Sequence, residues 1–310
     1  MKIIQNEIEI KPFKNKTFDL YFKNMSLGVF DIETTGLNPS YCYLILSGFM
    51  IIKDSKATFI QYFAENLDDE KEVLTKTFQL LSSLDTVLTY NGKNFDMNFI
   101  EKRRLKYNLP FYKTPYILDL YLLLNGHSHF RDFIPNLKQK SIEKFMGIAS
   151  DREDEISGKE SVEMYKRYLS SKDKKIMEQI LLHNSDDIQQ LYKLLDVIPK
   201  INFHSGMYSL GFPCKNGFII NKIYISGKVL HVKGFYNQDC SSYEFYGNHT
   251  ANFNFFLDSL NKIFIIEIPL ERLEDVLFSD IESLDIDKNI FKNFANYVSG
   301  FLIVYRNGQT

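Results

Sequence analysis

The chain has 310 residues, of which 45% are hydrophobic and 25% are charged, and its formal net charge is −2. These proportions are those of an ordinary globular protein with room for one large domain or two smaller ones. The near-neutral charge excludes a globally basic nucleic-acid coat, but not an enzyme whose bound metal ions neutralise phosphate.

Three cysteines, Cys42, Cys214 and Cys240, are far apart and form no CxxC pair. This spacing indicates neither a zinc knuckle nor a disulfide framework, and it is typical of reduced thiols in the cytoplasm. The first residues interleave Lys, Glu and Asn with apolar residues, unlike a signal peptide. No apolar run approaches the roughly 20 residues of a membrane span. We therefore expect a cytoplasmic protein without a membrane partner.

An extension over residues 1–26 is expected to pack on the domain that follows it. Apolar runs between turn signals predict strands at 27–33, 44–52, 57–63, 86–90 and 116–119. Apolar residues at helical spacing predict helices over 67–84, from 94 or 95 to 107, and over 141–147, 161–169 and 174–195. The order indicates an α/β domain over 27–200, with a mixed five-stranded sheet that has helices on its faces and an antiparallel start.

The composition changes near residue 200, beyond which Gly, Asn, Ser and aromatic residues dominate short alternating runs. This pattern predicts a smaller α+β or β-rich C-terminal domain over 205–310, of unknown role. Within it, residues 270–278 and 290–297 are expected to be helical. Its Tyr and Phe residues are expected to form a hydrophobic core rather than a surface that stacks on bases.

Two acids, Asp31 and Glu33, stand at the end of the first buried strand, in the stretch Phe30-Asp-Ile-Glu-Thr-Thr-Gly-Leu37. Residues two apart on a strand share a face, so both carboxylates point the same way. Burying two unpaired charges side by side is unfavourable, and a bound Mg²⁺ or Mn²⁺ ion would remove that penalty. The alternative is an exposed strand end with solvated acids. The whole stretch favours the metal.

Further acids follow at Asp96, in the first turn of a helix after a strand, and at Asp187 in the helix over 174–195. The junction of a strand and the next helix is where α/β folds build sites, although a lone acid there also suits the helix dipole. His183 and Asp187 are four residues apart and share the inward stripe, where a satisfied core pair is the alternative. Asp186 is one position off that stripe and is expected to be solvated.

Three stretches together resemble the motifs of the DEDD group of 3′-5′ exonucleases, within the ribonuclease H-like fold: FDIETTGL at 30–37, NGKNFD at 91–96 and HNSDD at 183–187. Over about residues 25–196, the chain is most similar to the YprB-like branch of bacterial ribonuclease H-like proteins. The resemblance implies a ribonuclease H-like sheet and a site for two Mg²⁺ or Mn²⁺ ions held by Asp31, Glu33, Asp96 and Asp187. It also implies that His183 orients or deprotonates the attacking water.

The chain departs from this group at one position. One DEDD branch has Tyr with three residues before the last Asp, and the other has His with four. Here His183 precedes Asp187 with three residues between them, so a histidine stands at the tyrosine spacing. Whether His183 is the general base is left open by this spacing.

The resemblance also suggests how a strand would bind. Two ions about 4 Å apart would clamp the scissile phosphate, with Asp31 bridging both. The residues expected to line the terminal nucleotide are Thr34, Thr35, Gly36 and Leu37, and those expected to touch the next nucleotide are Asn91, Asn94 and Phe95. Arg103, Arg104 and Lys106 are either a basic patch for the strand's phosphates or a solvated helix face. Asp119 is a secondary site candidate, and His127 and His129 are expected at the surface.

The leading prediction is a metal-dependent 3′-5′ exonuclease that hydrolyses phosphodiester bonds at single-stranded DNA or RNA ends by a two-metal mechanism. The alternative is a ribonuclease H-like module that binds nucleic acid or a protein partner with little or no catalysis. A third reading makes the C-terminal domain the main binding unit and the nuclease its effector. Protein partners cannot be predicted from the sequence.

Overall fold

A computed structural model describes residues 1–23, 25–148, 156, 158–214, 217–236, 241–246, 253–273 and 276–278. The chain forms two compact units. The first unit comprises Met1–Asn15 and Asn24–Phe203, and the second comprises Lys16–Lys23 and His204–Thr310. The domain boundaries expected at residues 26 and 200–205 stay predictions.

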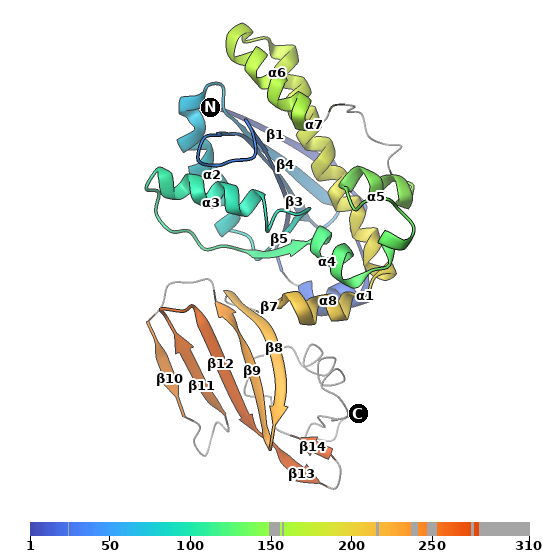
Figure 1. Ribbon diagram of the computed structural model, residues 1–310, viewed down its shortest axis with the longest axis vertical. Coiled ribbons are helices and arrows are strands. Elements are labelled where there is room, and N and C mark those ends of the chain that lie inside the picture. Colours follow the sequence, from blue (N-terminus) through green and yellow to red (C-terminus); the bar gives the residue numbers. More distant parts are fainter. Residues whose placement is uncertain are drawn as a thin grey trace. The chain divides into compact units, whose positions relative to one another are not determined.

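The first unit is built on a six-stranded sheet in the order β1-β4-β3-β2-β5-β6 (Figure 1). Its strands are β1 (Lys2–Glu9), β2 (Leu27–Thr34), β3 (Leu44–Lys53), β4 (Lys56–Phe63), β5 (Thr86–Thr89) and β6 (Tyr116–Asp119). β1, β4, β3 and β2 are antiparallel neighbours, while β5 and β6 run parallel to β2. The mixed α/β sheet is confirmed, but the expected number of five strands is wrong, because β1 adds a sixth along the edge of β4.

Helices cover both faces of this sheet (Figure 1). They are α2 (Glu70–Ser82), α3 (Asp96–Lys106), α4 (Leu120–His127), α5 (Gln139–Met146), α6 (Gly158–Ser171) and α7 (Lys174–Lys193), with short 3₁₀ turns η1 (Leu67–Asp69), η2 (Phe130–Asp132) and η4 (Leu194–Lys200). On β3, the Ser47 hydroxyl bonds Thr77 of α2 at 2.6 Å, whereas the adjacent Gly48 faces Asn184 of α7. Adjacent strand residues face opposite sides, so α2 and α7 lie on opposite faces.

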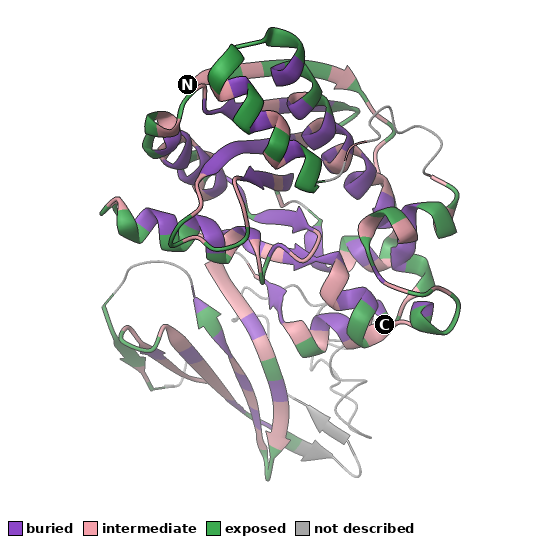
Figure 2. Ribbon diagram, turned by 45° about the horizontal axis from the view of Figure 1, so that its top comes forward, coloured by how far each residue is buried: buried purple, intermediate pink, exposed green. Residues whose placement is uncertain are grey.

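Two hydrophobic layers result from this arrangement, and Figure 2 shows buried residues gathered on the central strands. On the α2 face, Phe30 and Ile32 of β2 pack with Leu74 and Phe78 of α2 and Phe99 of α3. On the other face, buried residues of β3 and β4 pack against α6 and α7, among them Leu46, Phe63, Tyr165, Tyr168 and Ile180. The acids Asp31 and Glu33 alternate with Phe30 and Ile32, so they lie on the α7 face.

A fully buried ion pair ties α2, α3 and the loop after β2 together. Arg103 Nε donates to Glu70 Oε1 at 2.7 Å, and Arg103 Nη2 contacts the second carboxylate oxygen, with both side chains entirely buried. Glu70 also accepts from the Leu44 amide and the Tyr107 hydroxyl, both at 2.7 Å. Arg103 Nη1 donates to the Pro39 carbonyl at 3.0 Å.

Both readings of the basic residues on α3 are therefore wrong for the two arginines. Arg103 is neither a phosphate contact nor part of a solvated face, because its guanidinium is bound to Glu70. Arg104 is also buried, and it bonds Glu101 and the carbonyl oxygens of Leu109 and Pro110. Of the expected patch, Lys106 alone is exposed.

The second unit contains an antiparallel sheet in the order β10-β11-β12-β9-β8-β7. Its elements are α1 (Lys16–Phe22), α8 (Phe203–Leu210), β7 (Phe212–Pro213), β8 (Phe218–Ser226), β9 (Val229–Tyr236), β10 (Tyr243–Phe245), β11 (Asn254–Asp258), β12 (Ile263–Pro269), β13 (Glu271–Leu273) and β14 (Val276–Phe278). Helix α8 begins at the last residue of the first unit. The prediction of a β-rich C-terminal region is confirmed.

One prediction in this unit is wrong. Within the stretch expected to be helical at 270–278, Glu271–Leu273 and Val276–Phe278 form the paired strands β13 and β14, because a short apolar run carries no period that separates helix from strand. The helix expected at 290–297 lies outside the described residues. Phe218, Tyr236 and Phe264 pack together, which agrees with the expected hydrophobic core.

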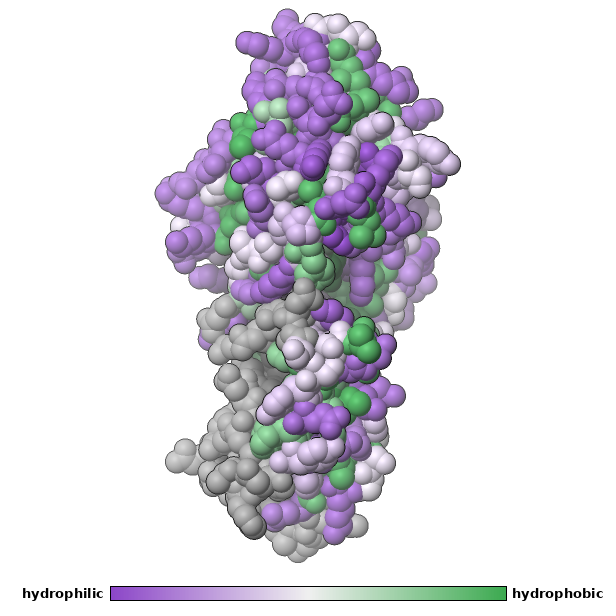
Figure 3. All heavy atoms as spheres, turned by 90° about the vertical axis from the view of Figure 1, so that its left-hand side faces the viewer, coloured by the Kyte–Doolittle hydropathy of each residue, from purple (hydrophilic) through white to green (hydrophobic). Residues whose placement is uncertain are grey.

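The described helices give no sign of a membrane segment, since none of them is long and apolar enough to cross a bilayer. On the face drawn in Figure 3, hydrophilic residues cover most of the first unit, with hydrophobic residues in smaller groups between them. The cytoplasmic location stays a prediction.

The buried pair predicts a large effect of removing one partner. Arg103→Met should lower the free energy of unfolding by about 3 kcal/mol or more, because Glu70 would stay buried without its counter-charge. The double variant Glu70→Met/Arg103→Met should recover part of that loss. Urea unfolding measures both, with Lys102→Ala on the exposed face of α3 as the matched control, expected within about 0.5 kcal/mol of the wild type. Equal stability of Arg103→Met and the control would contradict this role.

Candidate active site

The centre of the candidate site is the end of β2. Asp31 pairs with Gly48 of β3 in the antiparallel register, and Gly48 pairs in turn with Gln61 of β4. Residues directly opposite one another on neighbouring strands share a face. A row of Asp31, Gly48 and Gln61 therefore crosses the sheet beneath α7.

The missing side chain at Gly48 lets α7 approach this row. A Cβ atom at position 48 would lie 1.9 Å from Asn184 Oδ1 and 2.6 Å from Ile188 Cδ1. In the space above Gly48, Asn184 Nδ2 donates to Asp31 Oδ2 at 2.9 Å, and Asn184 Oδ1 accepts from Gln61 Nε2 at 2.9 Å. Gln61 Nε2 also donates to the Leu181 carbonyl at 2.8 Å. Asn184 is fully buried and fixes one oxygen of Asp31.

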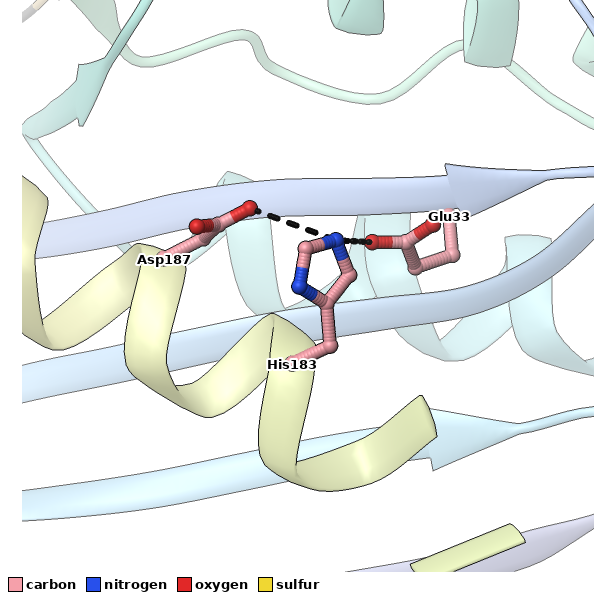
Figure 4. A group of neighbouring side chains, drawn as sticks. All are labelled: Glu33, His183 and Asp187. Carbon is pink, nitrogen blue, oxygen red and sulfur yellow. Dashed lines mark ion pairs between the residues drawn. The ribbon is translucent and has the colours of Figure 1, made fainter. Parts of the chain in front are cut away.

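The same turn of α7 places His183 beside two carboxylates (Figure 4). His183 Nε2 lies 3.6 Å from Glu33 Oε1 and 3.7 Å from Asp187 Oδ2. The imidazole and Glu33 are buried, while Asp187 is partly exposed. One atom from each of Glu33, His183 and Asp187 can be chosen so that all three lie within 4.8 Å of one another. A cation placed among them would reach nitrogen and oxygen donors from β2 and α7.

Two further carboxylates lie nearby, Asp96 buried and Asp31 partly exposed. Asp96 begins α3 and accepts from the Ile32 amide at 3.3 Å, which joins it to β2. The pKa of Asp96 is raised to about 7, mainly by burial and in smaller part by Asp119 and Glu33, against the opposing effect of its backbone hydrogen bonds. Burial also raises the pKa of Asp31 well above its usual value, with smaller contributions from Asp96, Asp187 and Glu33 and an opposing one from Asn184.

These shifts reflect burial together with the proximity of other carboxylates. Like charges that share a buried site disfavour ionisation, and a divalent cation is the usual way to balance them. Carboxylate oxygens with one imidazole and no thiolate are donors that suit Mg²⁺ or Mn²⁺ better than a zinc site. The donor set present at the end of β2 therefore fits the expected ions.

The carboxylate of Asp119, the secondary site candidate, accepts hydrogen bonds from backbone amides. It caps α4 by accepting from the Tyr121 amide at 3.0 Å, and it accepts from the amides of Asn91 and Lys93 at 2.8 and 3.0 Å. Asn91 stands at φ 60°, the left-handed conformation that Asn tolerates better than most residues. Asp119 thus shapes the turn that leads into Asp96.

A cleft of about 840 Å³ opens over the end of β2. Of the five predicted catalytic residues, it is lined by Asp31, Glu33, His183 and Asp187. Asp96 is not in this lining and is 5% exposed, beneath the surface residues. The structure thus gathers four of the five at one cavity and places the fifth behind them.

Of the residues predicted to contact nucleotides, some line this cleft and others do not. The cleft is lined by Thr34, Thr35, Gly36, Leu37 and Phe95. Asn91 and Asn94 are outside the lining, and the Asn94 amide donates to Asn91 Oδ1 at 3.0 Å. Contact between these two residues and a nucleotide stays a prediction.

Some positions differ from expectation. Asp186 was expected to be solvated but is buried, at 4% exposure, because α7 is covered on more than its inward stripe. His129 is exposed, as expected, whereas His127 is half-buried and its pKa is lowered by that burial. The sequence did not single out Asn184 or Gln61 as partners of Asp31, nor the cleft residues Lys138, Lys140 and Lys159. The short Lys-Gln-Lys run at 138–140 was the available signal for two of these lysines.

Comparison with known proteins places this site in a family. The profile of the RNase_H superfamily matches residues 29–198, which hold all five predicted catalytic residues. This match confirms the predicted ribonuclease H-like resemblance.

Individual relatives are more distant. The DNA polymerase III PolC-type protein of Ureaplasma parvum is 32% identical over 32% of this chain and 8% of its own length. That of Mycoplasmopsis pulmonis is 28% identical over 34% of this chain and 9% of its own length. The matched region is thus under a tenth of these relatives. Among solved structures, the family B DNA polymerase of Pyrobaculum calidifontis aligns with 56% of this chain and 25% of its own, with a TM-score of 0.45 and 14% identity.

The close approach at Gly48 predicts an energetic coupling. Gly48→Ala should lower the free energy of unfolding by about 1–3 kcal/mol, because the added methyl group collides with Asn184 and Ile188. In an Asn184→Ala background the same substitution should be milder by at least ~0.5 kcal/mol. Denaturant unfolding of the four proteins gives the coupling. Gly126→Ala, where nothing lies within 4 Å of the added Cβ, is the control. Strict additivity would contradict the contact.

The crowded carboxylates predict that Asp31→Asn stabilises the protein in the absence of divalent ions. Removing one negative charge should raise Tm by about 2–5 °C, as expected when a functional site is less than optimally stable. Added Mn²⁺ should raise Tm more in the wild type than in this variant. Thermal scans in EDTA and in Mn²⁺ measure both effects. The matched control is Asp54→Asn at an exposed turn with φ 55°. A lower Tm of Asp31→Asn in EDTA would show that the carboxylate stabilises the fold.

Proposed function

The chain belongs to the RNase_H superfamily, and we propose that it is a metal-dependent 3′-5′ exonuclease acting on single-stranded DNA or RNA ends. The observation that carries this proposal is the gathering of Asp31, Glu33, Asp187 and His183 at one cleft, with Asp96 buried behind them. The two DNA polymerases to which the chain is similar support a nucleic-acid substrate. The 3′-5′ polarity is proposed from the resemblance of the three motifs.

In the proposed site, Asp31, Glu33, Asp96 and Asp187 hold two Mg²⁺ or Mn²⁺ ions. When bound, such ions acidify water and stabilise negative charge on phosphate oxygens. Asn184 keeps Asp31 in one orientation through its 2.9 Å hydrogen bond, so the ligand is positioned before substrate arrives. The Ile32 amide does the same for Asp96 at 3.3 Å.

His183 is proposed to take a proton from the attacking water, or to orient it. Its Nε2 atom faces both Glu33 and Asp187, at 3.6 and 3.7 Å, and is therefore directed at the carboxylates that would hold the ions. Histidine is the side chain that most often serves as a general base in enzymes. The short spacing to Asp187 places both side chains on one face of α7, one turn apart.

The terminal nucleotide is proposed to lie against Thr34–Leu37. Thr34 Oγ1 donates to the Gly36 carbonyl at 2.8 Å, and Thr35 Oγ1 accepts from the Tyr43 amide at 2.9 Å, so this turn is fixed by its own side chains. Leu37 is 82% exposed at the cleft. A large apolar side chain in that position can pack against a base.

The test is hydrolysis of 5′-labelled and 3′-labelled single strands of DNA and RNA in Mg²⁺, Mn²⁺ or EDTA. A 3′-5′ exonuclease shortens the 5′-labelled strand stepwise and releases the 3′ label at once as a mononucleotide. Activity should vanish in EDTA. Asp31→Ala and Asp187→Ala should each lower kcat by roughly 10³-fold or more, since a lost metal ligand removes several kcal/mol of transition-state stabilisation.

Asp132→Ala, an exposed acid in the 3₁₀ turn η2, is the matched control and should keep wild-type activity. Activity that persists in EDTA, or that survives both site substitutions, would contradict the two-metal proposal. Binding of oligonucleotides without any hydrolysis would instead favour a ribonuclease H-like binding module.

A further inference from the structure

A group of lysines stands on the wall of the active-site cleft formed by α5 and α6. Lys138 is the residue before α5, Lys140 is in its first turn, and Lys159 is in the first turn of α6. All three side chains are exposed and line the same cleft as Asp31, Glu33 and Asp187. One cavity is therefore lined both by acids from β2 and α7 and by lysines from the starts of α5 and α6.

The hydrogen bonds and ion pairs of this wall show which charges are available. Lys140 Nζ donates to the Ile156 carbonyl at 2.8 Å, which engages its ammonium group. Glu163 also lines the cleft, but it pairs with Lys166 at 2.8 Å. Within the described part of the chain, neither Lys138 nor Lys159 forms an ion pair with a side chain. Lys138 and Lys159 thus contribute cationic side chains to the lining that are not neutralised by such a pair.

The lining of the cleft includes three kinds of side chain: acidic, apolar and basic. Carboxylates lie at the end of β2, the apolar side chains of Leu37 and Phe95 form another part of the wall, and the lysines form a third. A phosphodiester strand offers a matching set: a reacting phosphate, an apolar base and the next phosphate along the backbone. A free mononucleotide offers no second phosphodiester for the lysines.

We propose that Lys138 and Lys159 bind the phosphate next to the scissile one, so that the cleft selects a polynucleotide strand over a single nucleotide. The inference rests on the proposed nuclease function and adds the residues that hold the rest of the strand. A chain with a net charge of −2 and a carboxylate cluster repels a polyanion. Local cations at the cleft offset that repulsion where the strand must enter.

The test measures binding separately from hydrolysis. Fluorescence anisotropy follows a labelled dT12 or rU12 strand in Ca²⁺ in place of Mg²⁺, over a range of KCl concentrations. Lys138→Ala/Lys159→Ala should weaken binding by about tenfold at low salt, and the slope of log Kd against log salt should fall by about 0.7, because the two lysines are proposed to neutralise one phosphate. The DNA and RNA arms identify which strand the wall prefers.

Two further proteins separate charge from folding. Lys138→Arg/Lys159→Arg keeps both charges and should restore binding and salt slope. Lys71→Ala/Lys102→Ala removes two exposed lysines from α2 and α3, outside the lining of the cleft, and should bind as the wild type does. In Mg²⁺, the KM for dT12 should rise in the first variant, whereas hydrolysis of the p-nitrophenyl ester of thymidine 5′-monophosphate, which has no second phosphodiester, should stay within about twofold.

Each outcome bears on the inference. Unchanged binding and salt slope in the alanine variant would overturn it, even if the wild type degrades the strand and the nuclease proposal stands. A wild type that binds neither strand would overturn it as well. A wild type that binds both strands and hydrolyses neither, with the loss confined to the alanine variant, would support the phosphate site and contradict the nuclease.

Discussion

The candidate site depends on how closely α7 approaches β3. The approach is possible because Gly48 has no side chain: a methyl group there would overlap Asn184. With α7 at this distance, Asn184 reaches across the strand to Asp31 and Gln61, and the residue before it, His183, comes to lie beside Glu33. One turn later, Asp187 reaches the same place. A single packing contact between a helix and a glycine thus sets the relative positions of residues from the start and the end of the domain.

The acidic side chains on the two faces of the sheet have different surroundings. On the α2 face, the buried carboxylate of Glu70 accepts hydrogen bonds from Arg103, the Tyr107 hydroxyl and the Leu44 amide, so its negative charge is fully compensated. On the α7 face, Glu33 is buried beside the partly exposed Asp31 and Asp187, and the neighbouring carboxylates add to the burial that raises the pKa of Asp31. Arg103 also holds the Pro39 carbonyl in the loop that follows Thr34–Leu37. The Glu70–Arg103 pair can therefore hold the cleft wall in place, while the acids at the end of β2 are grouped as a cation site requires.

The features that were predicted correctly are those that depend on neighbouring residues in the sequence. The strands from β2 to β6 and the helices α2, α3 and α7 follow from apolar periodicity, and Asp31 and Glu33 follow from alternation on a strand. The missed features depend on distant partners. β1 is an edge strand whose residues are mostly polar or exposed, so it has little apolar pattern. Arg103 stands in a run of charged residues that resembles a solvated face, and its partner Glu70 lies 33 residues away. Asn184 gains its role from Gly48 and Gln61, neither of which is unusual alone.

The grouping of both acids and lysines at the cleft explains how it can bind a nucleic-acid strand although the net charge of the chain is close to zero. Carboxylates at the end of β2 favour cations, and Lys138 and Lys159, which line the same cleft, favour anions. In the proposed enzyme, ions held by the carboxylates lower the repulsion that a phosphate meets at Asp31 and Glu33, so metal and strand bind more tightly together than alone. Linkage requires the strand to strengthen metal binding by the same factor. A site that is electrostatically incomplete until both ligands are present would hold neither ions nor nucleotides firmly by itself, and it would be fully assembled only on a phosphodiester strand.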